Sequence, residues 1–249
     1  MGPTADYVGI GLQNWAEKRV KNASRIFEKA AQKLGPKIDE PGAVPPRILK
    51  DVLQEGSYCD DELTAEYFGG VLASSRSEVP RDDRAATYLK LTSELSTYQI
   101  RFHYICYATW RKMFTGSGLR PTFGVDLDKM WIFLPASFLL RAMEFTNAEP
   151  APDILIHCMS GLERHETLRF SHWGSVEHVN PLNAARGWCE VNEYGLCVAP
   201  TQFGIDYWLW AIGVGQTSIT KFLQDDLTLP RLPEIELSDG PIKLISGEQ

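Results

Sequence analysis

Apolar residues at helical spacing dominate the first 115 residues, and this pattern constrains the fold more than any other feature of the sequence. They recur at intervals of three and four residues, which places them on one face of a helix. Glycines and prolines such as Gly35-Pro36 and Gly56-Ser57 interrupt the pattern and end the periodic segments. The pattern predicts four helices, over residues 15–34, 46–53, 62–72 and 84–114.

The second half of the sequence mixes helix and strand patterns. Asp126 is expected to cap a helix that continues to Leu140 and is kinked or split at Pro135. Beyond it, the segments alternate in a way that favours a small winged-helix-like unit with a β-hairpin. Their expected order is helix, strand, long turn, strand and helix, over residues 151–164, 167–173, 174–187, 188–198 and 203–212.

These patterns predict a mainly α, α+β protein with two domains and a tail. A helical bundle is expected over residues 1–120, the winged-helix-like unit over 121–226, and an extended Pro-rich tail over 227–249. The composition, with 44% apolar and 23% charged residues, is that of a soluble globular chain and excludes a disordered one. The net charge of −7 excludes a protein that coats nucleic acid with its whole surface.

The charged residues are distributed unevenly along the chain. Residues 15–37 carry seven Lys or Arg against two acids, and residues 51–100 carry ten acids against four bases. Five of the cations fall in one arc of the first predicted helix, opposite its apolar stripe: Lys18, Lys21, Arg25, Lys29 and Lys33. This basic face is a candidate site for a phosphate backbone, an anionic lipid surface or an acidic protein. A solvated face, or one neutralised by the acidic block, is the structural alternative.

The other chemistry-bearing groups favour structural roles. Asp60, Asp61 and Glu62 precede a predicted helix, where capping explains them better than Mg²⁺ binding or acid–base catalysis does. The pair Gly69-Gly70 lies inside that helix and indicates close helix packing. Signatures of nucleotide binding, zinc proteases and serine hydrolases are absent from the sequence. The chain is therefore expected not to be an enzyme.

No metal ion or other cofactor is expected either. His165, His172, His178, Cys189 and Cys197 lack the close spacing of zinc ligands. The odd cysteine count, the absence of a signal-peptide pattern and the shortness of the longest apolar run (130–140) predict a cytoplasmic protein without a membrane span.

Aromatic residues concentrate in the last third of the chain. Trp208 and Trp210 lie two positions apart on a predicted helix, and by spacing alone they cannot both face inward. Tryptophan is enriched at interface hot spots. Most of these aromatic residues are expected in the core, and one of Trp208 and Trp210 is the interface candidate.

Several segments together resemble the Abi-alpha family of bacterial proteins. The N-terminal ones are KRVKNASRIFEKAAQKLG (18–35), VPPRILKDVLQEGSYCDDELTAEYFGGVLASS (44–75) and LTSELSTYQIRFHYIC (91–106). In the C-terminal part, GLERHETLRF (161–170) and VAPTQFGIDYWLWAIG (198–213) are similar to the family's last strand pair and its helix entry. The resemblance carries over no catalytic residues.

The resemblance implies a part in abortive infection, in which a phage-infected bacterial cell stops growing or dies. We expect a non-enzymatic sensor or effector that binds a phage or host macromolecule or a partner protein, encoded by the phage or by a neighbouring gene; an oligomer is also possible. Two other functions stay open at this stage. One is a winged-helix regulator that binds nucleic acid, and the other is a hydrolase or nuclease that uses the acidic cluster with Mg²⁺.

Overall fold

The computed structural model describes residues 3–79, 81–237 and 239–245, and the chain divides into two compact units. Unit 1 consists of residues 1–94, 210–216 and 230–232, and unit 2 of residues 95–209, 217–229 and 233–249. The described residues form a mainly helical protein with one small antiparallel sheet, which confirms the α+β class. The division falls at residue 94 and not at the predicted 120, because the expected long helix there is broken in two.

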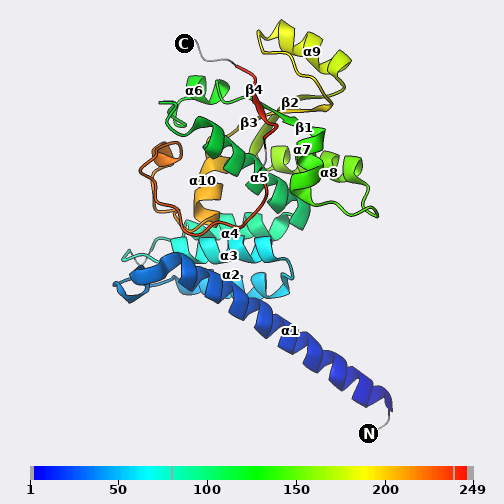
Figure 1. Ribbon diagram of the computed structural model, residues 1–249. Coiled ribbons are helices and arrows are strands. Elements are labelled where there is room, and N and C mark those ends of the chain that lie inside the picture. The colour runs from blue at the N-terminus through cyan, green and yellow to red at the C-terminus, as the bar shows by residue number, and fades with distance from the viewer. Residues whose placement is uncertain (1–2, 80, 238, 246–249) are drawn as a thin grey trace. The chain divides into compact units, whose positions relative to one another are not determined.

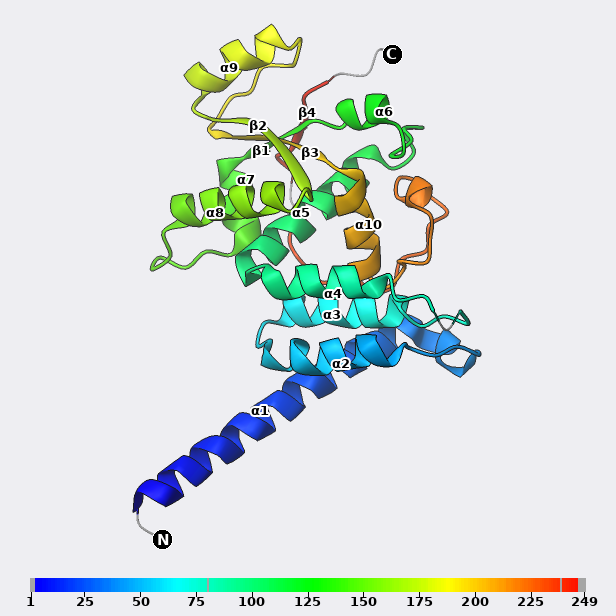
Figure 2. The ribbon, with the colours of Figure 1, turned by 180° about the vertical axis from the view of Figure 1, so that it is seen from behind.

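Unit 1 is built from the helices α1 (Pro3–Leu34), α2 (Pro46–Gln54), α3 (Glu62–Ser74) and α4 (Ala85–Glu94). Short 3-10 turns follow α1 and α2, at the glycines that the sequence marked as breaks. The first three helices are close to the predicted ranges, except that α1 begins twelve residues before Trp15. Figures 1 and 2 show the N-terminal half of α1 extending beyond α2 and α3.

The glycine pair of α3 allows two close helix contacts within unit 1. A Cβ atom at Gly69 would lie 2.6 Å from the Cβ of Lys29 in α1. A Cβ atom at Gly70 would lie 1.6 Å from the carbonyl oxygen of Ala211. Nearby, the Ser74 hydroxyl donates to the Trp210 carbonyl oxygen at 3.1 Å. Close packing is therefore confirmed as the reason for these two glycines.

The predicted helix over 84–114 is wrong as a single element. It is two helices, α4 in unit 1 and α5 (Thr97–Phe114) in unit 2. Ser96 has an extended backbone and forms a capping box with Gln99. The Gln99 side-chain oxygen accepts from the Ser96 amide at 2.8 Å, and the Ser96 hydroxyl accepts from the Gln99 amide at 3.3 Å. The sequence Ser-Thr-Tyr-Gln carries this start signal.

The sheet of unit 2 contains β1 (Ile132–Pro135), β2 (Leu168–Gly174), β3 (Gly195–Pro200) and β4 (Ile242–Lys243). Its order is β2-β3-β1-β4, and neighbouring strands are antiparallel. In the central pair, Ile132 is opposite Val198 and Pro135 is opposite Gly195. The predicted antiparallel pair β2–β3 is present, but it belongs to a four-stranded sheet and not to a two-stranded wing.

The predicted helix from Asp126 to Leu140, kinked or split at Pro135, is also wrong. The segment forms α6 (Gly124–Asp128), then β1, then α7 (Ala136–Met143). All four residues of β1 are buried, and a short apolar run of this kind fits a buried strand as well as a helix. Pro135 ends the strand and immediately precedes α7. No helical hydrogen bond requires an N–H at this position, so the missing N–H of proline is tolerated. Asp126 lies inside α6 and does not cap it.

The remaining helices of the chain are α8 (Ala151–Arg164), α9 (Val176–Ala185) and α10 (Gln202–Ala211). The predicted helices at 151–164 and 203–212 are confirmed within a residue or two. The predicted turn over 174–187 contains α9, with Pro181 inside it, and β3 is shorter than the predicted 188–198. In the tail, the described residues from 227 onward form only the two-residue strand β4.

Candidate functional site

The basic face of α1 is paired with acidic residues of the same unit. Four of its five cations make ion pairs, by N–O distance Lys18–Asp60 (2.5 Å), Arg25–Glu62 (3.6 Å), Lys29–Glu66 (2.7 Å) and Lys33–Glu66 (2.8 Å). Lys21 is exposed and makes no ion pair with a described residue. Most of the basic face therefore pairs with the acidic cluster, and together they form the contact between α1 and the start of α3.

The ion pair between Lys33 and Glu66 is the most buried part of this contact. The side chains of Lys33 and Glu66 are only 4% and 14% exposed. Burial alone would raise the pKa of Glu66, but the hydrogen bonds and the positive charges of Lys29 and Lys33 together outweigh it and lower that pKa. Asp61 caps α3, because its carboxylate accepts from the Thr64 amide at 2.7 Å. Within the described ranges, no three His, Cys, Asp or Glu side chains are grouped so that they could hold a metal ion.

The two interface candidates, Trp208 and Trp210, are fully buried, at 0% and 1% exposure. Trp208 packs edge-on against Phe222, with ring centroids 5.6 Å apart, both in unit 2. Trp210 stacks on Tyr88 at 5.0 Å, both in unit 1. The spacing argument failed because α10 is covered on more than one side, so neither tryptophan offers an exposed interface.

A buried polar cluster joins β2, α9 and β3 around His172. Its Nε2 atom lies 2.7 Å from the Asn183 side-chain oxygen and 3.5 Å from the Cys197 sulfur, while Nδ1 lies 2.8 Å from the Ser171 hydroxyl and 3.1 Å from the Arg186 guanidinium. In a Cys–His–Asn triad, the thiol and the amide contact opposite nitrogens of the imidazole ring. Here Cys197 and Asn183 both lie next to Nε2 of His172. Burial raises the pKa of Cys197 to about 12, which suppresses the reactive thiolate. The cluster is suited to holding α9 on the sheet.

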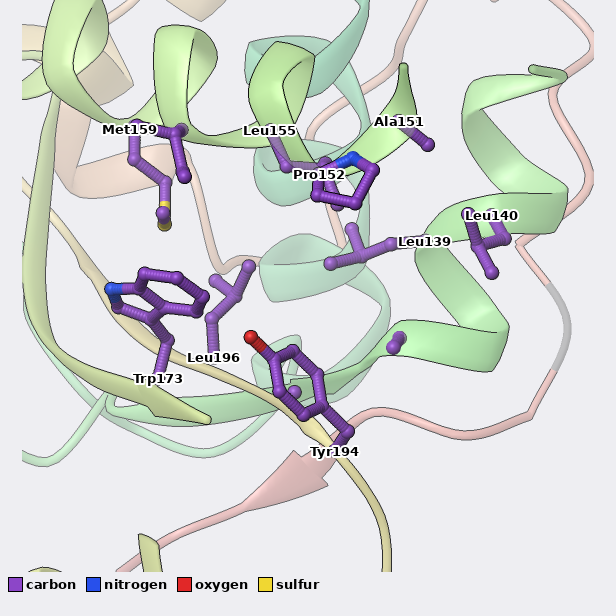
Figure 3. A pocket seen from close by; sticks show the side chains of 12 residues that line it. Leu139, Leu140, Ala151, Pro152, Leu155, Met159, Trp173, Tyr194 and Leu196 are labelled. Carbon is purple, nitrogen blue, oxygen red and sulfur yellow. The ribbon is translucent and has the colours of Figure 1, made fainter. Parts of the chain in front are cut away.

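An apolar pocket of about 220 Å³ opens in unit 2 between α7, α8 and the ends of β2 and β3. Figure 3 shows side chains converging on it from these elements. Leu139 of α7, Met159 of α8 and Leu196 of β3 are buried and form its floor. The two helices leave a gap over this end of the sheet, and no described side chain of unit 2 fills it.

Large apolar side chains surround the mouth of the pocket. Leu140, Ile156, Trp173 and Tyr194 are 48%, 41%, 44% and 47% exposed. Trp173 and Tyr194 meet edge to face, with ring centroids 6.1 Å apart. Single exposed apolar residues are ordinary on protein surfaces, but a contiguous group around a cavity is typical of a binding site.

The chemistry of the pocket selects an uncharged, apolar group. Its lining side chains are hydrocarbon, thioether or aromatic, and Figure 3 shows the Tyr194 hydroxyl and the Trp173 ring nitrogen as polar atoms beside it. A dry apolar cavity of about 150 Å³ accepts benzene in a well-studied lysozyme variant. A pocket of about 220 Å³ therefore has room for one large aliphatic or aromatic side chain.

Sequence reasoning did not identify this pocket. The helix predicted over 151–164 does contribute Leu155 and Met159 to its lining. The exposure of Leu140 and Ile156 has no signal in the sequence, because it depends on which elements fail to cover them.

In comparisons with known proteins, no family model, no curated protein and no solved structure matches the chain. Among the described helices, none is both long enough and apolar enough to cross a membrane.

Proposed function

We propose that this chain is an abortive-infection-type antiphage defence protein that acts by binding a partner protein at the apolar pocket of unit 2. The observation that carries the binding role is the group of four large apolar side chains, each more than 40% exposed, around one cavity. The defence role is supported by the resemblance of the segments at 18–35, 44–75 and 91–106 to the Abi-alpha family.

The energetics of the pocket favour a protein partner. Covering one large apolar side chain contributes about 1.5–3 kcal/mol, and part of that gain is still available at each half-exposed residue of the mouth. Trp and Tyr, both present at the mouth as Trp173 and Tyr194, are the residue types most enriched in binding hot spots. A partner that places one apolar anchor in the cavity and covers the mouth would gain most of this energy.

The pocket is a better binding surface than the basic face. Four of the five cations on that face already neutralise acids of unit 1, so a nucleic acid would have to displace Asp60, Glu62 and Glu66. The large apolar side chains at the mouth of the pocket, in contrast, are exposed. We therefore place the partner, a phage protein or the product of a neighbouring gene, at the pocket, in the cytoplasm and without a catalytic step.

The gene, together with its neighbours, should protect a sensitive bacterial host from at least one phage. The measurement is the plaque count on cells that carry the genes, compared with cells that carry an empty vector. Fewer plaques, with arrested growth of infected cells, are the expected result. Equal plaque counts across a broad phage panel would contradict the defence role.

A further inference from the structure

A buried histidine of unit 2, His172, connects β2 to α9. Its ring lies next to the side chain of Asn183 in α9 and next to Arg186, the residue that follows this helix. Cys197 and Leu196 are successive residues of β3, so their side chains lie on opposite faces of the sheet. Leu196 lines the apolar pocket, whereas Cys197 contacts His172. The histidine and α9 are therefore on the opposite face of the sheet from the pocket.

The hydrogen bonds around His172 determine which ring nitrogen carries the hydrogen. The Asn183 side-chain nitrogen donates to the Cys189 carbonyl oxygen at 2.9 Å, so the Asn183 side-chain oxygen faces the ring. That oxygen lies 2.7 Å from Nε2 and can only accept, so Nε2 carries the hydrogen and donates it. Nδ1 lies 3.1 Å from the Arg186 guanidinium, which can only donate, so Nδ1 accepts. The ring is therefore neutral.

A second proton on this ring conflicts with its surroundings. A hydrogen on Nδ1 would point at the guanidinium of Arg186, which is a permanent cation and has no acceptor. The hydroxyl of Ser171 lies 2.8 Å from Nδ1 and can accept a hydrogen bond, but it carries no charge to balance the ring. Two further titratable groups act on the ring: the thiol of Cys197, 3.5 Å from Nε2, and His178 of α9.

The electrostatics agree with this geometry. Burial and the charges of Arg186 and His178 hold the pKa of His172 below its ordinary value of 6.5. The hydrogen bond with Asn183 opposes these effects only in part. The contact between β2 and α9 thus favours the neutral ring.

We propose that His172 makes the contact between α9 and the sheet sensitive to acid, because its protonation releases α9. When Nδ1 takes up a proton, Arg186 loses its acceptor and the two cations repel each other, so the C-terminal end of α9 moves away from β2. The apolar cluster that joins Val179 of α9 to Phe133 of β1 and to Leu244 then becomes accessible to water. This inference depends neither on the pocket nor on the defence role.

The pH range of the release follows from the direction of the pKa shift. With α9 released, the ring is exposed to water and titrates near its ordinary value of about 6.5. With α9 in place, the ring titrates at a lower pH. Above about pH 6.5 the ring is neutral in both states, and the contact has its full stability. Below that pH the released state binds the proton first, so the equilibrium constant for release rises by up to about tenfold per pH unit until the packed ring is also protonated.

Hydrogen exchange of the full chain, measured by mass spectrometry at about pH 7.5 and about pH 5, tests this inference. After correction for the intrinsic exchange rates, the amide protection of α9 should fall roughly tenfold between the two pH values. The amides of α5, which carries the fully buried Ile100, Phe102 and Ile105, should keep their protection. Unchanged protection of α9 would overturn the inference. An equal fall in α5 would overturn it too, because unit 2 would then unfold as a whole.

Three variants identify the group that takes up the proton. His172→Gln keeps a donor for Asn183 and cannot be protonated, so the protection of α9 should be the same at both pH values, whatever its absolute size. Arg186→Gln, at an exposed position, removes the cation beside Nδ1, so the fall should be smaller than in the wild type. His165→Gln replaces a histidine outside the cluster and is the control, with the wild-type fall expected. A fall of wild-type size in His172→Gln or in Arg186→Gln would show that a different group controls α9.

Discussion

Replacing Gly70 by alanine is expected to lower the free energy of unfolding by roughly 3 kcal/mol or more, a large effect for one methyl group. The added Cβ would lie 1.6 Å from the carbonyl oxygen of Ala211 and 2.3 Å from its carbonyl carbon. Both of these atoms are backbone, so no side chain can turn aside, and α3 must move away from residues 210–211. Alanine otherwise stabilises a helix interior by about 1 kcal/mol over glycine, so a net loss can come only from the clash.

Chemical denaturation of the full chain measures this effect. Gly124→Ala is the matched control, because nothing lies within 4 Å of a Cβ atom at that position and it is the first residue of α6. We expect the control to change stability by no more than about 0.5 kcal/mol. A Gly70→Ala variant as stable as the wild type would show that α3 does not pack on residues 210–211 as described.

The ion pairs between α1 and α3 predict the second large effect. Glu66→Gln removes the acidic partner of Lys33, whose side chain is 4% exposed, and one of the partners of Lys29. Leaving a buried cation without its partner should cost roughly 3 kcal/mol. Glu28→Gln, the same substitution at an exposed position of α1, should cost less than about 0.5 kcal/mol. Equal stabilities of the two variants would mean that the Glu66 pairs contribute nothing.

The pH dependence of this difference follows from the lowered pKa of Glu66. An acid with a lowered pKa in the folded state stabilises the fold above its unfolded pKa, which is about 4.3 for glutamate. That stabilisation is lost as the pH falls through the folded value. The stability difference between the wild type and Glu66→Gln should therefore be constant near neutral pH and shrink below about pH 4.3. A difference that grows in acid would contradict the assignment.

The sequence predicted the helices of unit 1 well because local signals mark them. Glycine and proline end the periodic segments near Gly35 and Gly56, and Asp61 caps α3 as its position suggested. The charges of α1 and α3 were also evident, but their mutual pairing was one of three alternatives. Which surface a charged face meets depends on how the helices pack, and a linear pattern does not contain that information.

The errors in unit 2 have a similar cause. The apolar run at 130–140 is compatible with a helix and with a buried strand. Residues 132–135 form the strand β1 because they pair with β3 and β4, and the sequence pattern does not contain that pairing. The break between α4 and α5 did have a local signal, the capping box of Ser96 and Gln99, but the continuous apolar periodicity obscured it. The pocket could not be predicted, because a cavity depends on what the tertiary fold leaves uncovered.

The most direct test of the pocket as the functional site is protection from phage by Ile156→Glu, measured as a plaque count on cells that hold the variant and the wild type at equal protein levels. We predict that Ile156→Glu gives as many plaques as cells without the gene, because a carboxylate at the mouth of the apolar pocket prevents partner binding. Val125→Glu, which adds the same charge at an exposed site outside the pocket lining, should protect like the wild type. Full protection by Ile156→Glu would contradict the account.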